Sequence, residues 1–338
     1  MGVAFARSLL GLALAAALPA WPAAAQSPPA PPPPDTANIW TIQDESAAIS
    51  TAPLKDRYYT NGLRLGWTSA EGVVPDFLQR IGQTLWGEGR QRIAFDITQQ
   101  MYTAGDTSTP YPPLIDRPYA GVLMGTLSLI HDGSNARSVL ALGLGVVGPA
   151  SLAEQVQNGF HSLIGQSHDQ GWGTQLHNEP LLQITSERTW RLPMGSVGGL
   201  ETDALPEITA SVGNLRDYAQ AGVVVRIGQG LDADFGVARL RPGLTGTDVF
   251  RPTRAFTWYL FAGADAQAVA YDVTLNGNLW QASRSVKIVP AVGEFEGGLA
   301  LMAYGVRLTY THVVQTQEFQ HQKGGLHQMG SLAMSVRF

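Results

Sequence analysis

Segments of about ten residues, in which apolar and polar side chains alternate, recur along almost the whole chain. One of them is QRIAFDITQQMY (91–102), where Ile93, Phe95 and Ile97 share one face of an extended strand and Asp96 lies on the other. Successive side chains of a strand point to opposite faces, so each segment has one apolar and one polar face. Ten tilted residues also match the thickness of a bilayer. The pattern therefore predicts strands that are long enough to cross a membrane.

Twelve such segments predict an all-β protein, a transmembrane antiparallel barrel of about twelve strands. In YGVRLTYTH (304–312) the polar face carries Arg307, which needs a polar lumen or a partner there. RSVLALGLGVVG (137–148) is another clear case, and nine further segments lie near residues 39–48, 58–68, 119–131, 181–191, 204–213, 218–228, 256–266, 287–298 and 329–338. The aromatic residues expected in girdles at the two membrane interfaces are Trp67, Tyr102, Tyr119, Trp190, Trp258 and Tyr310.

The two ends of the chain favour export to the bacterial outer membrane. Residues 1–25 combine a basic residue, a short apolar run and a small-residue site, which predicts a signal peptide. Residues 26–36 predict a proline-rich, solvated linker, and the barrel is expected over 37–338. The last residues, SLAMSVRF (331–338), alternate up to a terminal aromatic, as the final strand of an outer-membrane barrel commonly does. We expect the barrel-assembly machinery to recognise this strand.

Composition supports a membrane barrel and excludes other classes. Charged residues make up 14% of the chain, against roughly 25% in soluble domains. The net charge of −5 and the lack of any basic run argue against a nucleic-acid partner. The chain has no cysteine, so an exported protein of this kind has to gain stability from something other than disulfides, such as a closed hydrogen-bonded barrel.

One segment departs from the alternation, since EQVQNGFHSLIG (154–165) has the spacing of an amphipathic helix. Ser151 followed by Glu154 matches a capping box, and Gly165 is a typical helix stop. The helix is predicted at 152–164, with an apolar stripe formed by Leu152, Val156, Phe160, Leu163 and Ile164. We expect this stripe to pack against the barrel wall or against acyl chains.

The predicted strand order places this helix outside the cell. When the strands are counted from the periplasm, segments 45–57, 102–118 and 148–180 become outer loops, and the helix falls in the third of them. A second helical segment at 75–87 falls on the periplasmic side, and the sequence predicts no role for it.

Several motifs in the outer loops resemble the LpxR family of outer-membrane lipid A deacylases. They are DRYYTNG (56–62), DRPYAG (116–121), GP followed by QVQN and His161, and GW followed by QLHNEP (175–180). The resemblance covers nearly the whole mature chain. It implies a twelve-stranded barrel that removes the 3′-acyloxyacyl group of lipid A, depends on Ca²⁺ and has its site between the wall and a loop helix.

The resemblance also implies a set of catalytic residues. His161 matches the family's histidine, the general base that activates water. Asp44 matches an essential acidic residue on the first strand, near the calcium, and Thr60 a hydroxyl residue on the second. Gln43 stands where the family has asparagine, and keeps the amide.

Substrate-binding residues are less well matched. The basic pair of some members falls in 107–113, which has no Lys or Arg, so Arg57 or Arg117 would have to substitute. Trp172 is either a wall of the site or an anchor at the membrane interface. A glutamate used by at least one member falls on Ser167, and Asp169 or Glu179 would have to replace it.

The candidate residues are of the types that ester hydrolysis requires. Such a reaction needs a base with a pKa near neutral, for which histidine is the usual residue. A carboxylate such as Asp44 is a suitable ligand for Ca²⁺, which polarises a carbonyl. The chain has neither a GxSxG motif nor a cysteine, which favours attack by water over a covalent nucleophile.

Structural readings of the same residues stay open. His161 on the wet face of a loop helix, Asp44 paired in the lumen with Arg64, Thr60 bonded only to its neighbours, and Arg117 paired with Asp116 would each need no catalysis. At the level of the protein, the alternatives are a non-enzymatic barrel, either a porin or a structural protein, and a barrel phospholipase.

Overall fold

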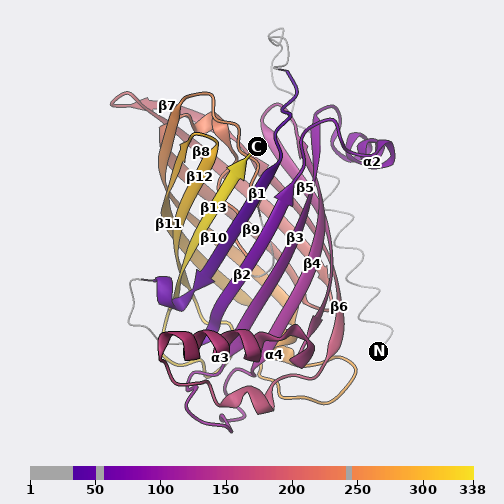
Figure 1. The fold of residues 1–338 in the computed structure, drawn as a ribbon, viewed down its shortest axis with the longest axis vertical. Helices are drawn as coiled ribbons and strands as arrows, with labels where there is room; N and C mark the ends of the chain where they lie inside the picture. The colour runs from indigo at the N-terminus through magenta and orange to yellow at the C-terminus, as the bar shows by residue number, and fades with distance from the viewer. Residues whose placement is uncertain (1–32, 51–56, 241–245) are drawn as a thin grey trace.

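The computed structural model describes residues 33–50, 57–240 and 246–338, which form one closed antiparallel β-barrel (Figure 1). The predicted signal peptide and the first part of the predicted linker lie outside the described residues. The strands are β1 (Ile39–Ser46), β2 (Tyr58–Thr68), β3 (Arg90–Thr103), β4 (Ala120–Asp132), β5 (Ala136–Val147), β6 (Glu179–Trp190), β7 (Leu192–Val197), β8 (Leu200–Gly213), β9 (Arg216–Gln229), β10 (Phe256–Asp272), β11 (Ala291–Ala303), β12 (Val306–Gln315) and β13 (His327–Arg337).

Twelve of these strands make the ring, which confirms the predicted barrel. Neighbouring strands pair in chain order, β6 pairs directly with β8, and β1 closes the ring on β13. The remaining strand, β7, pairs with the first residues of β8 and extends the β6–β8 hairpin beyond the ring. The sequence did not predict β7.

Short helices occupy both ends of the barrel. They are α2 (Asp76–Trp86), α3 (Ala153–Ile164) and α4 (Val273–Asn276), with 3-10 turns η1 (Ala47–Ile49), η2 (Pro149–Ser151), η3 (Gly171–Thr174) and η4 (Leu231–Ala233). Helix α3 lies in a long loop at one end, here called the loop end. Helix α2 lies at the other, the terminal end, where the C-terminus also lies (Figure 1). Among the described residues, no helix combines the length and the apolar character that a membrane crossing requires.

The outer surface of the wall carries an apolar belt. Its exposed side chains include Ile42, Leu63, Leu65, Phe95, Ile97, Leu127, Leu142, Leu144, Leu182, Val223, Val225, Leu260, Phe295, Leu301, Leu308, Leu332 and Met334. Side chains one position away along the strands are buried in the lumen, as the alternation predicted. Two of the six residues expected in interfacial girdles, Tyr102 and Tyr119, are buried, so that prediction is wrong for them.

The lumen is filled by the segment between β9 and β10, here called the plug (residues 230–240 and 246–250). Leu240 reaches far into the barrel, where its backbone N–H donates to the Glu45 carboxylate at 3.0 Å. Its carbonyl accepts from the Gln100 side-chain amide at 2.8 Å. Two cavities lined by lumen residues measure only ≈ 30 and ≈ 20 Å³, which is room for one or two waters each.

Ion pairs hold the plug in place. Arg239 on the plug lies 2.9–3.9 Å from carboxylates on four residues, namely Glu207, Asp265, Glu294 and Glu296. In the opposite sense, two plug carboxylates pair with guanidinium groups on the strands. Asp248 bridges Arg64 and Arg307, and Asp234 bridges Arg226 and Arg307. The polar lumen predicted from Arg307 is therefore present, and the two carboxylates that pair with Arg307 come from the plug.

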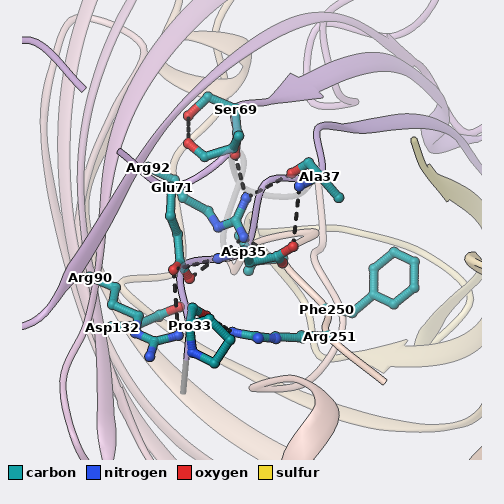
Figure 2. Close-up of polar contacts among 12 residues, drawn as sticks. Pro33, Asp35, Ala37, Ser69, Glu71, Arg90, Arg92, Asp132, Phe250 and Arg251 are labelled. Atoms are coloured by element: carbon teal, nitrogen blue, oxygen red, sulfur yellow. Dashed lines mark hydrogen bonds and ion pairs between the residues drawn. The ribbon is translucent and has the colours of Figure 1, made fainter. Parts of the chain in front are cut away.

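A second polar cluster closes the terminal end. Asp35, in the segment that precedes β1, accepts from Arg92 at 2.6 Å and from Arg337 at 2.7 Å. Its backbone N–H donates to Glu71 at 2.9 Å, as Figure 2 shows. Asp35 is buried, so the ordered structure begins before the predicted boundary at residue 37. The partners of Asp35 are distant in sequence, which is why a local composition argument placed it in the linker.

Candidate functional site

Helix α3 lies on the outside of the wall, across the loop ends of the strands (Figure 1). Its first turn is fixed where Gly121 of β4 leaves no room for a side chain: a Cβ there would lie 2.1 Å from the Ser151 hydroxyl and 2.4 Å from Ala153. The Gln99 side chain of β3 donates to the Ser151 carbonyl at 2.6 Å. The helix is thus docked on β3 and β4 and runs on towards β1.

The start of α3 differs from the predicted capping box. Leu152 is the N-cap residue, in the left-handed conformation with φ 59°, and its side chain makes no cap bond. The Ser151 hydroxyl accepts from the backbone N–H of Ala153 at 3.4 Å, not from that of Glu154 as a capping box requires. The Ser151 hydroxyl instead donates to the Gly148 carbonyl at 2.7 Å, within the turn η2. This turn orients the chain, so the capping-box prediction is wrong, whereas Gly165 ends the helix as predicted.

The polar face of α3 packs inward, which is the reverse of an ordinary surface helix. Ala153, Gln157 and His161 are its buried residues. The predicted apolar stripe is exposed and points away from the barrel, with Phe160 57% and Leu163 82% exposed. Packing of the stripe against the wall was therefore a wrong prediction, while contact with acyl chains stays a prediction.

His161 is only 6% exposed, so it does not lie on a wet face of the helix. Its Nδ1 lies 2.9 Å from the Ser167 carbonyl oxygen. Because a carbonyl only accepts, Nδ1 carries the hydrogen, and Nε2 is the ring nitrogen that can take up a proton. Residue 167 thus contributes through its backbone, a role that its side-chain identity does not reveal.

The loop after α3 is clamped against the same buried face. Asp169 accepts from the Gln157 side chain, and its backbone N–H donates to Asn158 at 3.0 Å. Asp169 is buried beside the helix. Glu179, the other candidate for the missing glutamate, is engaged by the backbone N–H groups of Leu279 and Trp280 in another loop. Of the two, only Asp169 belongs to the surroundings of α3.

The length of α3 indicates what lies beneath His161. Eight residues separate it from Ala153, which is about 12 Å along a helix and about two and a half strand spacings. Since Ala153 lies on β4, His161 is expected above β2 and the adjacent edge of β1. The outer surface there carries Thr60, Asn61 and Asp44.

A β-bulge shapes this patch of the outer wall (Asp44, Thr60 and Asn61), here called the floor. The β2–β3 register shifts between Tyr59 and Asn61, and Thr60 is the extra residue. Bulges re-aim side chains and are frequent beside active sites. Here the Thr60 hydroxyl meets that of Thr103 at 2.8 Å, on the outer side of the wall. Thr60 therefore lies on the second strand and bonds a neighbouring residue, as its structural reading expected, and its role in catalysis stays a prediction.

Asp44 and Gln43 lie on opposite faces of β1. Asp44 alternates with the exposed Ile42 and accepts from the Asn61 amide at 2.7 Å, on the outer surface. Gln43 points into the lumen, where it accepts from Arg64 at 3.0 Å and donates to the Ala238 carbonyl of the plug. The structure thus separates Gln43 from the other predicted catalytic residues. It also rules out an Asp44–Arg64 pair, because Arg64 bonds with Asp96 and Asp248.

An apolar groove of ≈ 470 Å³ runs along the outer wall beside Asp44. It is lined by residues of β1, β11, β12 and β13, namely Ile42, Gln43, Asp44, Leu299, Leu301, Leu308, Thr309, Tyr310, Leu332, Ala333 and Met334. The groove lies on the face that carries the apolar belt, so its natural contents are hydrocarbon chains.

The residues of the floor offer the type of ligand atom, oxygen, that calcium prefers. Ca²⁺ takes oxygen ligands, and the Asp44 carboxylate, the Asn61 amide oxygen and the Thr60 hydroxyl are oxygen donors on one patch of the wall. The described residues contain no group of three or more His, Cys, Asp or Glu that could hold a metal. A site with a single carboxylate is expected to bind Ca²⁺ weakly, since affinity depends on the number of charged ligands.

The two candidate substrate-binding arginines lie apart from this floor. Arg117 is fully buried and donates to Glu318 at 2.6 Å and to Thr274 at 2.7 Å. It therefore forms a structural ion pair, as the alternative reading predicted, but its partner is Glu318 and not Asp116. Arg57 is half-buried, with its guanidinium 5.6 Å from the Tyr58 ring. Asp56, the first residue of DRYYTNG, lies outside the described residues.

Trp172 packs beside the first residue of α3, Ala153. It is 1% exposed and packs edge-on against Tyr119 at 5.2 Å, in one cluster with Met101 and Ala153. Of the two open readings, the anchor at the membrane interface is therefore wrong. Sequence reasoning assigned no role to Asn61, Thr103 and Gln157, although Asn61 and Gln157 belong to quoted motifs and Asn61 shares the outward face of β2 with Leu63.

Comparisons with known proteins agree with this architecture. The model of the family described as outer membrane protein LpxR matches residues 9–338. LpxR from Salmonella typhimurium is similar in structure, with a TM-score of 0.71 and 22% identity over 89% of this chain and 100% of that chain. The β-domain of the Bordetella autotransporter BrkA gives a TM-score of 0.41 and 8% identity, over 90% of this chain and 98% of that one. No curated protein matches the sequence.

The family match spans nearly the whole chain, and the longest connection of the barrel, between β5 and β6, carries α3 at the loop end. The chain belongs to the LpxR family of outer-membrane proteins, and its barrel lies in the outer membrane.

Proposed function

We propose that the chain is an ester hydrolase that removes the 3′-acyloxyacyl group of lipid A. The observation that carries the proposal is His161, a buried histidine oriented by the Ser167 carbonyl and held over the lipid-facing side of the wall. Lipid A occupies the outer leaflet, the layer that this face of the barrel meets at the loop end.

His161 acts as the general base in this proposal. With Nδ1 donating to Ser167, Nε2 takes a proton from a water molecule, which then attacks the ester carbonyl. The tetrahedral intermediate breaks the bond between the carbonyl carbon and the 3′ oxygen of the sugar. That oxygen takes the proton from Nε2 and leaves as a hydroxyl, and the acyloxyacyl group leaves as a carboxylic acid. The buried face of α3 limits access of bulk water to this point. Beneath the imidazole ring, Asn61 orients the Asp44 carboxylate by donating to it, and the Thr60 hydroxyl is oriented by its bond with Thr103.

Asp44, Asn61 and Thr60 would hold Ca²⁺. The ion, when bound, supplies positive charge that polarises the ester carbonyl. The groove beside Asp44 suits one acyl chain of the substrate, with the exposed stripe of α3 as a further apolar surface.

The plug argues against the porin alternative. It lies in the lumen and is tied to the wall by several ion pairs, so the residues that the structure describes leave no open aqueous channel of the kind that a diffusion pore requires. The phospholipase alternative shares the apolar groove and differs only in the head group of the substrate.

Acyl release by purified protein tests the proposal. The full chain in detergent micelles with Ca²⁺ is offered lipid A or phosphatidylethanolamine, and products are identified by mass spectrometry. We expect release from lipid A, and a loss of about 10²–10⁴-fold in His161→Ala. His168→Ala is the matched control, because His168 lies in the loop after α3, is exposed, and its ring contacts the hydroxyl of Ser162 on the helix.

Undiminished release by His161→Ala would contradict the mechanism. Release from phosphatidylethanolamine alone would replace the proposed substrate. A folded protein that releases nothing from either lipid would favour a structural barrel.

A further inference from the structure

Helix α2, at the terminal end, carries an apolar stripe that no other part of the described structure covers. Its three large side chains, Phe77, Ile81 and Leu85, are 57%, 40% and 37% exposed. A spacing of four residues brings them to one side of the helix. Exposed apolar patches of this kind on an isolated element indicate a contact surface.

A different face of α2 is docked on the barrel. Gly82 lies so close to Gln91 that a Cβ would be 2.7 Å from its side-chain nitrogen. The Gln91 amide donates to the Gln79 carbonyl of the helix at 3.0 Å. The Trp86 ring lies 5.5 Å from the His131 ring. The helix is therefore held against β3 and β4.

The residues under α2 belong to the outward face of the wall. Gln91 and His131 lie opposite each other in the β3–β4 pairing. Each is an even number of residues from an exposed member of the apolar belt, Phe95 in β3 and Leu127 in β4, which are themselves paired. Because side chains of a strand alternate, α2 sits on the lipid-facing surface, directly beyond the end of the belt.

The remaining face of α2 is polar. At 3.6 residues per turn, the docked residues Gly82 and Trp86, the stripe centred on Ile81, and the polar pair Arg80 and Gln83 lie roughly 120° apart from one another. With the barrel at its side, the helix can turn its stripe towards the membrane and its polar face towards water. Figure 1 shows α2 beside the wall, near the level of the C-terminus.

We propose that α2 is an in-plane membrane anchor, whose Phe77, Ile81 and Leu85 insert into the acyl layer of the periplasmic leaflet. Continuity with the apolar belt is the argument for lipid as the occupant, because the stripe extends a surface that already faces hydrocarbon. Helices with a strong polar face and an apolar stripe bind membranes in this orientation. The anchor is independent of the active site, which lies at the opposite end of the barrel.

Spin labels measure the position of each face directly. The chain has no cysteine, so Ile81→Cys, Gln83→Cys and Leu127→Cys each give a single labelled site. The full-length variants are reconstituted into vesicles of phosphatidylethanolamine and phosphatidylglycerol. Collisions of each label with O₂, which concentrates in the acyl layer, are compared with collisions with a water-soluble nickel chelate.

We expect the ratio of O₂ to nickel collisions at Ile81 to approach that of the belt position Leu127, and the ratio at Gln83 to be that of water. Phe77→Cys repeats the measurement in case Ile81→Cys disturbs the helix. Equal, water-like ratios at Ile81, Phe77 and Gln83 would overturn the proposal. A stripe shielded from both reagents would also overturn it, since another protein surface would then be the occupant.

Discussion

Replacing Asp248 with asparagine removes one negative charge from the plug and turns one carboxylate oxygen into an NH2 donor. The Asp248 carboxylate is buried and joins two guanidinium groups of the wall, Arg64 of β2 and Arg307 of β12. Asparagine keeps the size of the side chain and one oxygen acceptor. The substitution therefore tests how strongly the plug is held by charge.

The expected cost follows from the number of bonds. A hydrogen bond to a charged group contributes about 1.5–3 kcal/mol, and Asp248 makes two. After the substitution Arg64 still pairs with Asp96, and Arg307 still pairs with Asp234, so neither guanidinium is left without a carboxylate partner. Asparagine can replace only one of the two bonds, so we expect Asp248→Asn to lower the free energy of unfolding by about 1.5–3 kcal/mol.

Urea unfolding of vesicle-reconstituted protein, followed by fluorescence of the eight tryptophans, measures this difference. Asp232→Asn is the matched control, since Asp232 is an exposed carboxylate on the same segment, and its substitution should change stability by about 0.5 kcal/mol or less. Burial alone would raise the pKa of Asp248, but Arg64 and Arg307 hold it below its ordinary value.

The lowered pKa fixes the sign of the pH dependence. A carboxylate with a depressed folded pKa stabilises the protein above its unfolded pKa, about 3.9, and loses this contribution as the pH falls through the folded value. The gap between wild type and Asp248→Asn should be full at pH 7 and shrink below about pH 4. Equal stability of Asp248→Asn and Asp232→Asn at pH 7, or a gap that widens in acid, would refute the reasoning.

Three further predictions concern other parts of the chain. Asp44→Asn, or removal of Ca²⁺ by a chelator, should abolish acyl release while the protein stays folded by circular dichroism, and unchanged release in the chelator would exclude a role for the ion. Trp172→Phe should cost about 1 kcal/mol in urea unfolding and Trp172→Ala about 3–5, because the Trp172 side chain contributes packing; equal costs would contradict this. Asp35→Asn should release the segment before β1 from Arg92 and Arg337, so that added protease cleaves it in the folded protein, whereas unchanged protection would show that other contacts suffice.

The wall of the barrel could be predicted from sequence because its signal is local. Alternation with a period of two is set by neighbouring residues, and Arg307 on a polar face correctly required a charged lumen. The plug left no such signal, since the sequence over 230–255 has no periodicity. The conformation of residues 230–240 and 246–250 is set by ion pairs of Arg239, Asp234 and Asp248 with distant strands. The same reasoning misplaced Asp35 in a solvated linker.

The site was predictable where residues occupy regular strand positions. Alternation along β1 already separates Gln43 from Asp44, and with Ile42 on the lipid face it assigns Asp44 to that face. Local rules failed where tertiary packing decides. The turn η2 overrides the capping box at Ser151, and no sequence rule indicates that the Ser167 carbonyl orients His161.

The pairing of β1 with β13 has a consequence for the order of folding. Thr41 and Ser335 bond across this pair although they are 294 positions apart, a loop closure that costs about 5 kcal/mol in chain entropy. Nearly all other strand pairs join neighbours in the chain, so this seam is expected to form last, and until then β1 and β13 are open edges able to capture other chains. Asp44 of β1 and Leu332 of β13 face each other across the seam and line one groove. Under the proposed function, a barrel that has not yet closed has no place for the acyl chain of the substrate, and catalytic competence arises in the same step that removes its last unpaired edges.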